Sequence, residues 1–346
     1  MLNFASDYNI GAHECVLKRL VETNFERTAS YGTDEYSHAA EEKIKALASS
    51  PNARVYFLTG GTQTNAVALS SILRGYQGVV SAVSGHIATH EAGAIEYTGH
   101  KVIELPHTDG KISAENLSLC FDSYYSDENR EHTVMPGAVY ISHPTEYGTL
   151  YSLDELRSIS QICRKNGAYL YLDGARLGYA LAADTNDVSL SDIAELCDLF
   201  YIGGTKVGAL FGEALVVTRP ELCPCFTSTV KQHGALFAKG RLIGVQFDAL
   251  FTDNAYVSIA RHAVERAMEL RAALEGIGVK MYIDSHTNQQ FAILPDDVIE
   301  KIRADVALTM WERYDESSSV VRFVTSFATE SREVCELVSI IRKYMQ

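Results

Sequence analysis

Short apolar runs separated by longer mixed segments follow one another through the first two thirds of the chain. Most of these runs are continuous rather than alternating, which is typical of strands buried on both faces of a mostly parallel sheet. Segments 63–73 and 153–166 have helical spacing, and another helix is expected to begin at Glu91. The seven predicted strands are 55–58, 78–83, 101–105, 137–142, 168–172, 199–202 and 213–217. This order predicts an α/β fold in which helices cover a mostly parallel seven-stranded sheet.

The pattern changes near Asp253. A long helical segment, 255–274, is followed by shorter elements: predicted strands at 279–283, 290–294 and 320–325, and predicted helices near 297–304 and 330–344. We expect a large ligand-binding domain over 1–252 and a small C-terminal α+β domain over 253–346. The N-terminal segment 1–25 is expected to contribute to the site of the large domain.

Composition narrows the possible partners and locations. The 346 residues are 47% hydrophobic, enough for a large core, and carry a net charge of -14, which opposes binding to nucleic-acid phosphates. The seven cysteines are scattered, and Cys223 and Cys225 lack metal-ligand spacing, so we expect no metal and reduced thiols in the cytoplasm. The start of the chain resembles no signal peptide, and no window reaches the roughly 20 apolar residues of a membrane span.

Two strands are expected to end in residues with complementary chemistry. Asp173 ends the apolar run 168–172, and Lys206 follows the run 199–202 after two glycines and Thr205. In parallel sheets, ligands bind beside the carboxyl ends of strands. A lysine that forms a Schiff base and an aspartate that pairs with a protonated pyridine nitrogen are the two groups that pyridoxal phosphate needs. The pair therefore predicts this cofactor and a substrate that is a small amino acid.

A glycine-rich turn offers a place for the phosphate. Gly60, Gly61 and Thr62 follow the strand 55–58 and open a helix, where free N–H groups and a partial positive charge favour an anion. No lysine follows as in a P-loop, so a single phosphate monoester fits better than a nucleotide. An ordinary strand-to-helix turn explains the same residues equally well.

Several other polar residues could complete the site. His86, after the strand 78–83, could stack on a planar ring and transfer protons, or could simply be a loop histidine. Arg176, three residues after Asp173, could pair with that aspartate or bind a substrate carboxylate. Arg322 lies in a predicted strand and is either a carboxylate ligand or an exposed edge charge. The cations in 231–241 either reach a phosphate or form a solvated loop.

The motifs together resemble the threonine aldolase family, among the fold-type I pyridoxal-phosphate enzymes related to β-eliminating lyases, whose fold is the pyridoxal-phosphate-dependent transferase type. The resemblance extends over nearly the whole chain. Its most specific marks are the Gly61-Thr62 turn with Asn65, His86 followed by Glu91-Ala-Gly93, the segment Asp173-Gly-Ala-Arg176, the Lys206 segment, and Arg322-Phe-Val-Thr325.

The resemblance implies a role for each matching position. Lys206 would hold the cofactor covalently, Asp173 would pair with its ring nitrogen and His86 would stack on the ring. Gly61, Thr62 and Thr205 would bind the phosphate, with Arg241 reaching the cofactor of a neighbouring subunit. Ser6, Arg176 and Arg322 would bind the substrate carboxylate, and Tyr31 belongs to a loop near the site. The implied assembly is a homodimer or homotetramer with shared active sites.

Two departures from the family pattern affect the substrate. Thr205-Lys206-Val207 replaces the common Ser-Lys-Gly, and Thr145-Glu146-Tyr147 stands where many members have Thr-His-Asn, whose histidine lies near the substrate hydroxyl. The loss of that imidazole leaves open the preference between threonine and allo-threonine.

The implied reaction is aldol cleavage of L-threonine or L-allo-threonine to glycine and an aldehyde, with His86 taking the proton of the β-hydroxyl group. β-Elimination or transamination of another small amino acid on the same scaffold is the alternative. A non-catalytic ligand-binding relative is a third interpretation, against which the intact Lys206 and Asp173 argue.

Overall fold

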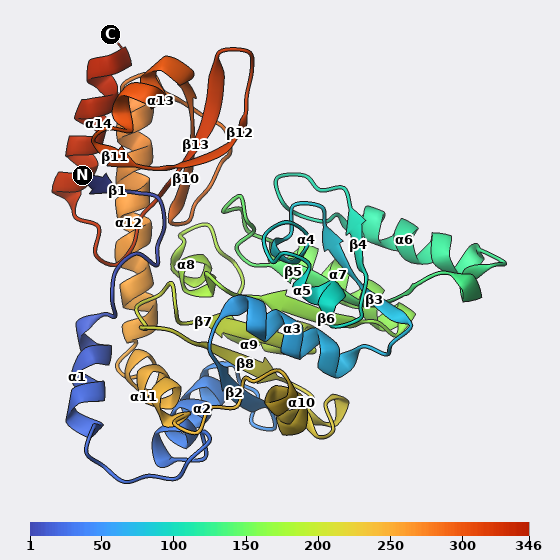
Figure 1. Ribbon diagram of the computed structural model, residues 1–346. Helices are drawn as coiled ribbons and strands as arrows, with labels where there is room; N and C mark the ends of the chain where they lie inside the picture. The colour runs from blue at the N-terminus through green and yellow to red at the C-terminus, as the bar shows by residue number, and fades with distance from the viewer. Residues whose placement is uncertain (346) are drawn as a thin grey trace.

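A seven-stranded sheet forms the centre of the computed structural model, which describes residues 1–345 (Figure 1). The strands are β2 (Arg54–Leu58), β3 (Gln77–Ala82), β4 (Val102–Leu105), β5 (Met135–Ser142), β6 (Tyr169–Asp173), β7 (Leu199–Gly203) and β8 (Glu213–Val217). Their order is β2-β8-β7-β6-β5-β3-β4. β8 runs antiparallel to both neighbours, and the other paired strands are parallel. The prediction of a mostly parallel seven-stranded sheet is confirmed, and each strand end lies within two residues of its predicted place.

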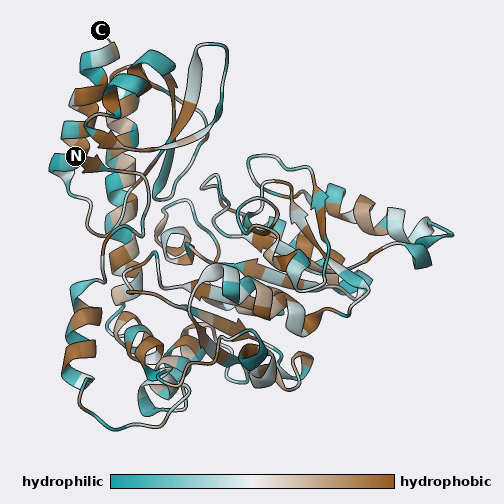
Figure 2. Ribbon diagram, viewed as in Figure 1, coloured by the Kyte–Doolittle hydropathy of each residue, from teal (hydrophilic) through white to brown (hydrophobic). Residues whose placement is uncertain are grey.

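Apolar layers cover both faces of this sheet. Val139 and Ile141 of β5 belong to one buried cluster, whereas Ala138 and Tyr140 belong to the other. Successive side chains of a strand point to opposite faces, so a strand covered on both sides needs a continuous apolar run. In Figure 2 the central strands are mainly brown, the colour of hydrophobic residues.

Helices divide between the two faces according to these clusters. The first face is covered by α2 (Glu35–Leu47), α6 (Ala114–Ser126), α7 (Leu153–Asn166), α8 (Leu177–Ala182), α9 (Leu190–Leu196) and α11 (Arg241–Leu250). The second is covered by α3 (Gly61–Ile72), α4 (His86–Thr89), α5 (Ala94–Tyr97) and α10 (Phe226–Gln232). Local sequence sets the ends of α7: Ser152 and Glu155 form a capping box, and Gly167 ends the helix at φ 66°.

Some elements differ from the predictions. The helix expected from Glu91 is only the single turn α5, because Gly93 interrupts the backbone at φ 74°. The predicted strand at 279–283 is reduced to β9 (Lys280–Met281). Helices α1 (Glu14–Thr23), α2 and α6, and the edge strand β12 (Thr309–Arg313), were not predicted.

The C-terminal part is built on one long helix. α12 (Ala255–Gly276) extends from the central sheet to a four-stranded antiparallel sheet of order β12-β13-β10-β9 (Figure 1). This sheet contains β10 (Gln289–Pro295) and β13 (Ser318–Val324), and it is covered by α12, α13 (Asp296–Ile302) and α14 (Ser331–Met345). None of the helices within residues 1–345 is long and apolar enough to cross a membrane.

The N-terminus lies with this C-terminal part rather than with the sheet that follows it in sequence. β1 (Leu2–Asn3) pairs in parallel with β11 (Val306–Ala307), and Phe4 packs against Phe323. The chain then runs past the end of the central sheet into α1, which contacts α11. Residues 5–13 therefore connect the two parts of the molecule.

Candidate active site

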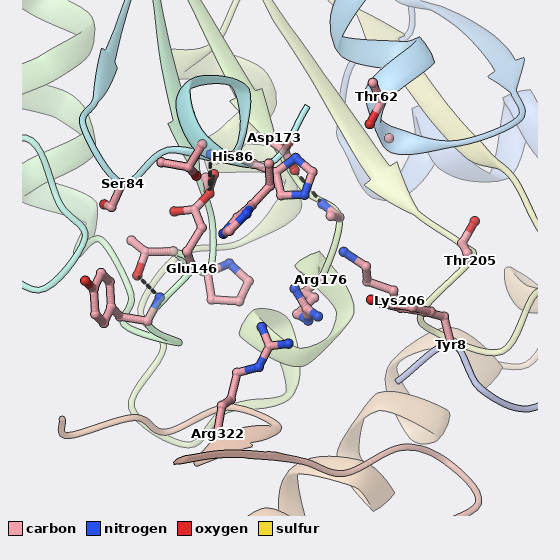
Figure 3. A pocket seen from close by; sticks show the side chains of 18 of the residues that line it. Tyr8, Thr62, Ser84, His86, Glu146, Asp173, Arg176, Thr205, Lys206 and Arg322 are labelled. Atoms are coloured by element: carbon pink, nitrogen blue, oxygen red, sulfur yellow. Dashed lines mark hydrogen bonds between the residues drawn. The ribbon is translucent and has the colours of Figure 1, made fainter. Parts of the chain in front are cut away.

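A cavity of about 690 Å³ lies between the carboxyl ends of the central strands and the C-terminal sheet. It brings together eight residues that the sequence singled out: Gly61, Thr62, His86, Asp173, Arg176, Thr205, Lys206 and Arg322. Figure 3 shows Lys206 and Glu146 on opposite sides of this pocket, with Arg322 on the side of the C-terminal part and Arg176 between Arg322 and Lys206.

Asp173 is a buried carboxylate surrounded by hydrogen-bond donors. Its Oδ2 accepts from the Tyr140 hydroxyl at 2.6 Å and from Asn65 Nδ2 at 3.1 Å, and its Oδ1 accepts from the Ala175 N–H at 2.9 Å. Burial alone would raise the pKa of Asp173, but the charge of His86 and the Tyr140 hydrogen bond lower the pKa overall. An ionised carboxylate at the floor of the pocket suits a cationic ring nitrogen. Arg176 does not pair with Asp173, because its guanidinium group is bound by Asp7.

Lys206 is half-buried just after β7. Burial is the largest cause that lowers the pKa of Lys206, and the positive charge of Arg176 adds to it. Tyr179 donates a hydrogen bond to the Lys206 carbonyl and so fixes the backbone at this point. A lysine with a lowered pKa has more of the neutral amine that forms Schiff bases.

His86 is held by a buried acid that the sequence did not single out for a role. Its Nδ1 lies 2.7 Å from Glu91 Oε1, which also accepts from Asn65 Nδ2 at 2.7 Å. Tyr171 in turn donates to Asn65 Oδ1. One hydrogen-bonded network therefore fixes both His86 and Asp173.

The start of α3 forms a cradle of backbone and small side chains. Gly60 precedes the helix in an extended conformation, and the Thr62 side chain lies beside the pocket. A Cβ at Gly61 would come within 3.0 Å of the Tyr201 hydroxyl, so a larger residue would crowd this turn. The cradle fits a phosphate monoester.

Thr205 also lines the pocket, and its hydroxyl already has a partner. It donates to Glu213 Oε1 at 2.8 Å, and the Gly204 N–H donates to Glu213 Oε2 at 2.9 Å. Burial raises the pKa of Glu213 to about 7. Glu213 was not among the predicted site residues, because in the sequence it is simply the first residue of an apolar strand.

Two arginines supply positive charge from different parts of the fold. Arg176 is bound by the buried Asp7 through Nε at 2.8 Å and Nη2 at 3.0 Å. Arg322 lies 5.1 Å over the Trp311 ring and donates to Gln289 at 3.1 Å, while its buried Nε has no partner within residues 1–345. Burial, followed by the charge of Arg176, lowers the pKa of Arg322 to about 10. Such a cationic corner suits a carboxylate ligand.

Three residues implied by the family resemblance do not line this pocket. Ser6 is outside it, although its neighbours Asp7 and Tyr8 reach Arg176 and Lys206. Arg241 donates to the carbonyl groups of Thr23 and Glu26 in its own chain. Tyr31 is half exposed, and its ring lies 5.3 Å from Lys231 Nζ.

The donor set fits pyridoxal phosphate. Asp173 can meet the ring nitrogen, Lys206 the aldehyde carbon, His86 a ring face, and the start of α3 the phosphate. Within residues 1–345 no group of three His, Cys, Asp or Glu side chains is arranged for a metal ion. Fold and site together define a fold-type I pyridoxal-phosphate enzyme.

Comparisons with known proteins identify the family. The profile of the beta-eliminating lyase family matches residues 3–297. A solved threonine aldolase from Leishmania major is 40% identical, with a TM-score of 0.96 and full coverage of both chains. A low specificity L-threonine aldolase from a Pseudomonas species is 29% identical over 99% of this chain and 97% of its own length. The chain belongs to the beta-eliminating lyase family and, within it, to the threonine aldolases. The resemblance seen in the sequence is thus confirmed.

More distant structures share the fold alone. A putative L-allo-threonine aldolase from Listeria monocytogenes is 19% identical with a TM-score of 0.75, and an aspartate aminotransferase from Thermus thermophilus is 16% identical with a TM-score of 0.73.

The raised pKa of Glu213 leads to a prediction about the cofactor-free protein. Since this pKa lies above its ordinary value of 4.5, the folded protein keeps a proton that the unfolded chain releases between those two values. The ionised carboxylate therefore costs stability above about pH 7, and the cost disappears as pH falls toward about 4.5. We expect Glu213→Gln to raise the free energy of unfolding by about 1–3 kcal/mol at pH 8, and by much less at pH 5.

Denaturant unfolding of the cofactor-free protein at both pH values measures this difference. Glu336→Gln, which changes an exposed carboxyl in the interior of α14, is the matched control and should change neither value. Equal effects of Glu213→Gln at pH 5 and pH 8 would contradict the prediction.

Proposed function

We propose that this protein cleaves L-threonine and L-allo-threonine to glycine and an aldehyde, with pyridoxal phosphate bound covalently to Lys206. The observation that carries the proposal is the convergence of Lys206, Asp173 and the cationic corner of Arg176 and Arg322 on one pocket. The names of the similar Leishmania and Pseudomonas proteins support the same substrate.

Each group has a distinct task in this proposal. Arg322 and the free edge of Arg176 hold the substrate carboxylate, and Asp7 keeps Arg176 oriented. Asp173 stays ionised and stabilises a protonated ring nitrogen, and His86 covers one ring face. Lys206 would hold the cofactor covalently and, as an amine of lowered pKa, would be able to move protons. Bound here, pyridoxal phosphate accepts the electron pair of the substrate bond that breaks.

Substrate orientation decides which bond breaks. The carboxylate clamp of Arg176 and Arg322 would fix the substrate so that only one of the bonds at Cα is placed to give its electrons to the cofactor. In aldol cleavage it is the Cα–Cβ bond. β-Elimination, the alternative that the family name supports, requires a proton to leave Cα instead, with Lys206 as its base.

The assembly belongs to the proposal as well. Arg241 and Tyr31 lie outside the pocket of their own chain, and the exposed apolar residues Leu17, Val21 and Phe25 lie on or just beyond α1. These features support a homodimer or homotetramer in which the apolar residues are covered by a neighbouring subunit, and Arg241 and Tyr31 reach the active site of that subunit. The seven free cysteines support a location in the reducing cytoplasm.

The test is an absorbance scan of the purified protein with pyridoxal phosphate, followed by addition of each threonine isomer. We expect a visible absorbance band and release of acetaldehyde and glycine in equal amounts. A band without aldehyde would contradict aldol cleavage, and pyruvate from L-serine would favour elimination. Without any band, the cofactor assignment fails.

A further inference from the structure

Glu146 is a half-buried carboxyl group of the pocket that has no task in the proposed function. It lies in the loop after β5. Its Oε1 accepts from the His86 backbone N–H at 2.9 Å and from the Ser142 hydroxyl at 2.6 Å. Oε2 has no hydrogen-bond partner within residues 1–345 and keeps some contact with the open cavity. One oxygen is thus anchored, and the other is free to meet a ligand.

The surroundings set the ionisation of this carboxyl group. Burial is the largest cause that raises the pKa of Glu146, and the negative charge of Asp173 raises it further. Hydrogen bonds from Ser142 and the charge of His86 act in the opposite direction. Several titratable or charged groups border this side of the pocket. They are His86 on α4, His90 just after α4, Glu91 before α5, Tyr140 on β5, Tyr147 next to Glu146, Asp173 on β6, Glu312 on β12 and Arg322 on β13. A carboxylate of raised pKa is a stronger proton acceptor than an ordinary surface acid.

His86, the first candidate for the same task, is less free to perform it. Its Nδ1 is fixed by Glu91, whose side chain is fully buried, so this contact restricts the orientation of the imidazole ring. The stacking position assigned to His86 uses the face of this ring. Figure 3 shows Glu146 on the His86 side of the pocket, across from Lys206. A substrate held by the two arginines between these walls would turn its β-substituents toward one of them.

We propose that Glu146 is the catalytic residue that accepts the proton of the substrate β-hydroxyl group, an inference that rests on the proposed function. Oε2 takes the proton, and the O–H electron pair becomes the second bond of the aldehyde carbonyl. Pyridoxal phosphate, when bound, would supply the acceptor for the Cα–Cβ electron pair. Cα gains one proton, and Glu146 gives up the one it took. No net proton is gained or lost, and the products are glycine and the aldehyde.

The test compares holoenzymes with glutamate and glutamine at position 146. Glu146→Gln keeps the size of the side chain and an oxygen for Ser142 and His86, but it cannot take a proton. We expect threonine cleavage to fall by about 100-fold or more. Exchange of the glycine α-proton with deuterated solvent needs no β-hydroxyl chemistry, so it should stay within about threefold of wild type.

Two further readouts separate a proton acceptor from a structural residue. The first is ligand binding: the preference for L-serine over L-alanine, which differ by the β-hydroxyl group, should fall about fivefold because a charged acceptor becomes neutral. The second is the pH profile: wild-type cleavage should be lost as pH falls through the raised pKa of Glu146, whereas glycine exchange should lack this loss. Glu336→Gln is the control for both.

The outcomes distinguish this inference from the proposed function. If neither threonine isomer gives aldehyde with wild-type protein, the proposed function fails. If wild type cleaves and Glu146→Gln cleaves equally well, or loses cleavage and glycine exchange together, only the role of Glu146 is overturned. Should Glu146→Gln not fold, Ser142→Ala removes one donor from Oε1 and should move the acidic loss of cleavage to higher pH; an unmoved profile would overturn the role.

Discussion

Replacing Lys206 with alanine is expected to lower threonine cleavage by roughly 10⁴-fold or more, since removal of a covalent catalytic group can cost about 10⁶-fold. The physical reason is that no other lysine lines the pocket within residues 1–345, so no second amine can hold the cofactor. The neighbouring residues that bind the ring and phosphate would remain. Cofactor should therefore still bind, but only reversibly.

Borohydride reduction followed by peptide mass measurement checks this directly. In wild type the peptide that contains Lys206 should gain the mass of the reduced cofactor, and in Lys206→Ala no peptide should. Lys165→Ala, which changes an exposed lysine near the end of α7, should behave like wild type. Full aldehyde production by Lys206→Ala would remove the basis of the mechanism.

Asp173→Asn should have the second largest effect. Asparagine occupies the same space and can accept the Tyr140 hydrogen bond, but it carries no charge to stabilise a protonated ring nitrogen. Loss of one partner of a buried ion pair costs about 3–5 kcal/mol, and if most of that falls on the barrier, kcat drops by roughly 10²–10³-fold. The cofactor should remain attached to Lys206, with a changed visible spectrum.

Steady-state kinetics on the reconstituted variant measure kcat, and the spectrum reports the ring nitrogen separately. Asp122→Asn on the exposed side of α6 provides a charge-matched control. If Asp173→Asn kept wild-type kcat with an unchanged spectrum, the ring nitrogen would have to meet another group.

Continuous apolar runs made the central sheet easy to predict. β7 and β8 are buried along their whole lengths, so nearly every position had to be apolar or small, and few other structures accept such a run. Asp173 and Lys206 could be recognised because each breaks this rule at the point where a strand ends. The signal for each of these two residues lies in the few residues around it, and the same is true of the turn at Gly60.

The rest of the pocket is formed by contacts between residues that lie far apart in the sequence, and no local sequence pattern encodes such contacts. Asp7 contacts Asn288 and Arg176, which are 281 and 169 positions away. Trp311 belongs to β12, a short edge strand with mixed polar and apolar residues and little burial. Glu91 and Glu213 look like surface acids in sequence, and only burial by distant elements turns them into parts of a network.

The pairing of β1 with β11 also has a consequence for biosynthesis. Leu2 leaves the ribosome among the first residues, but its partner Val306 emerges only after almost nine tenths of the chain has been made. The central sheet can assemble during translation, since domains fold as they emerge. Asp7 and Tyr8, however, must wait for the last elements before they can close over Arg176 and Lys206. Nascent chains stalled before residue 306 should therefore lack a finished pocket, which delays activity until synthesis is nearly complete.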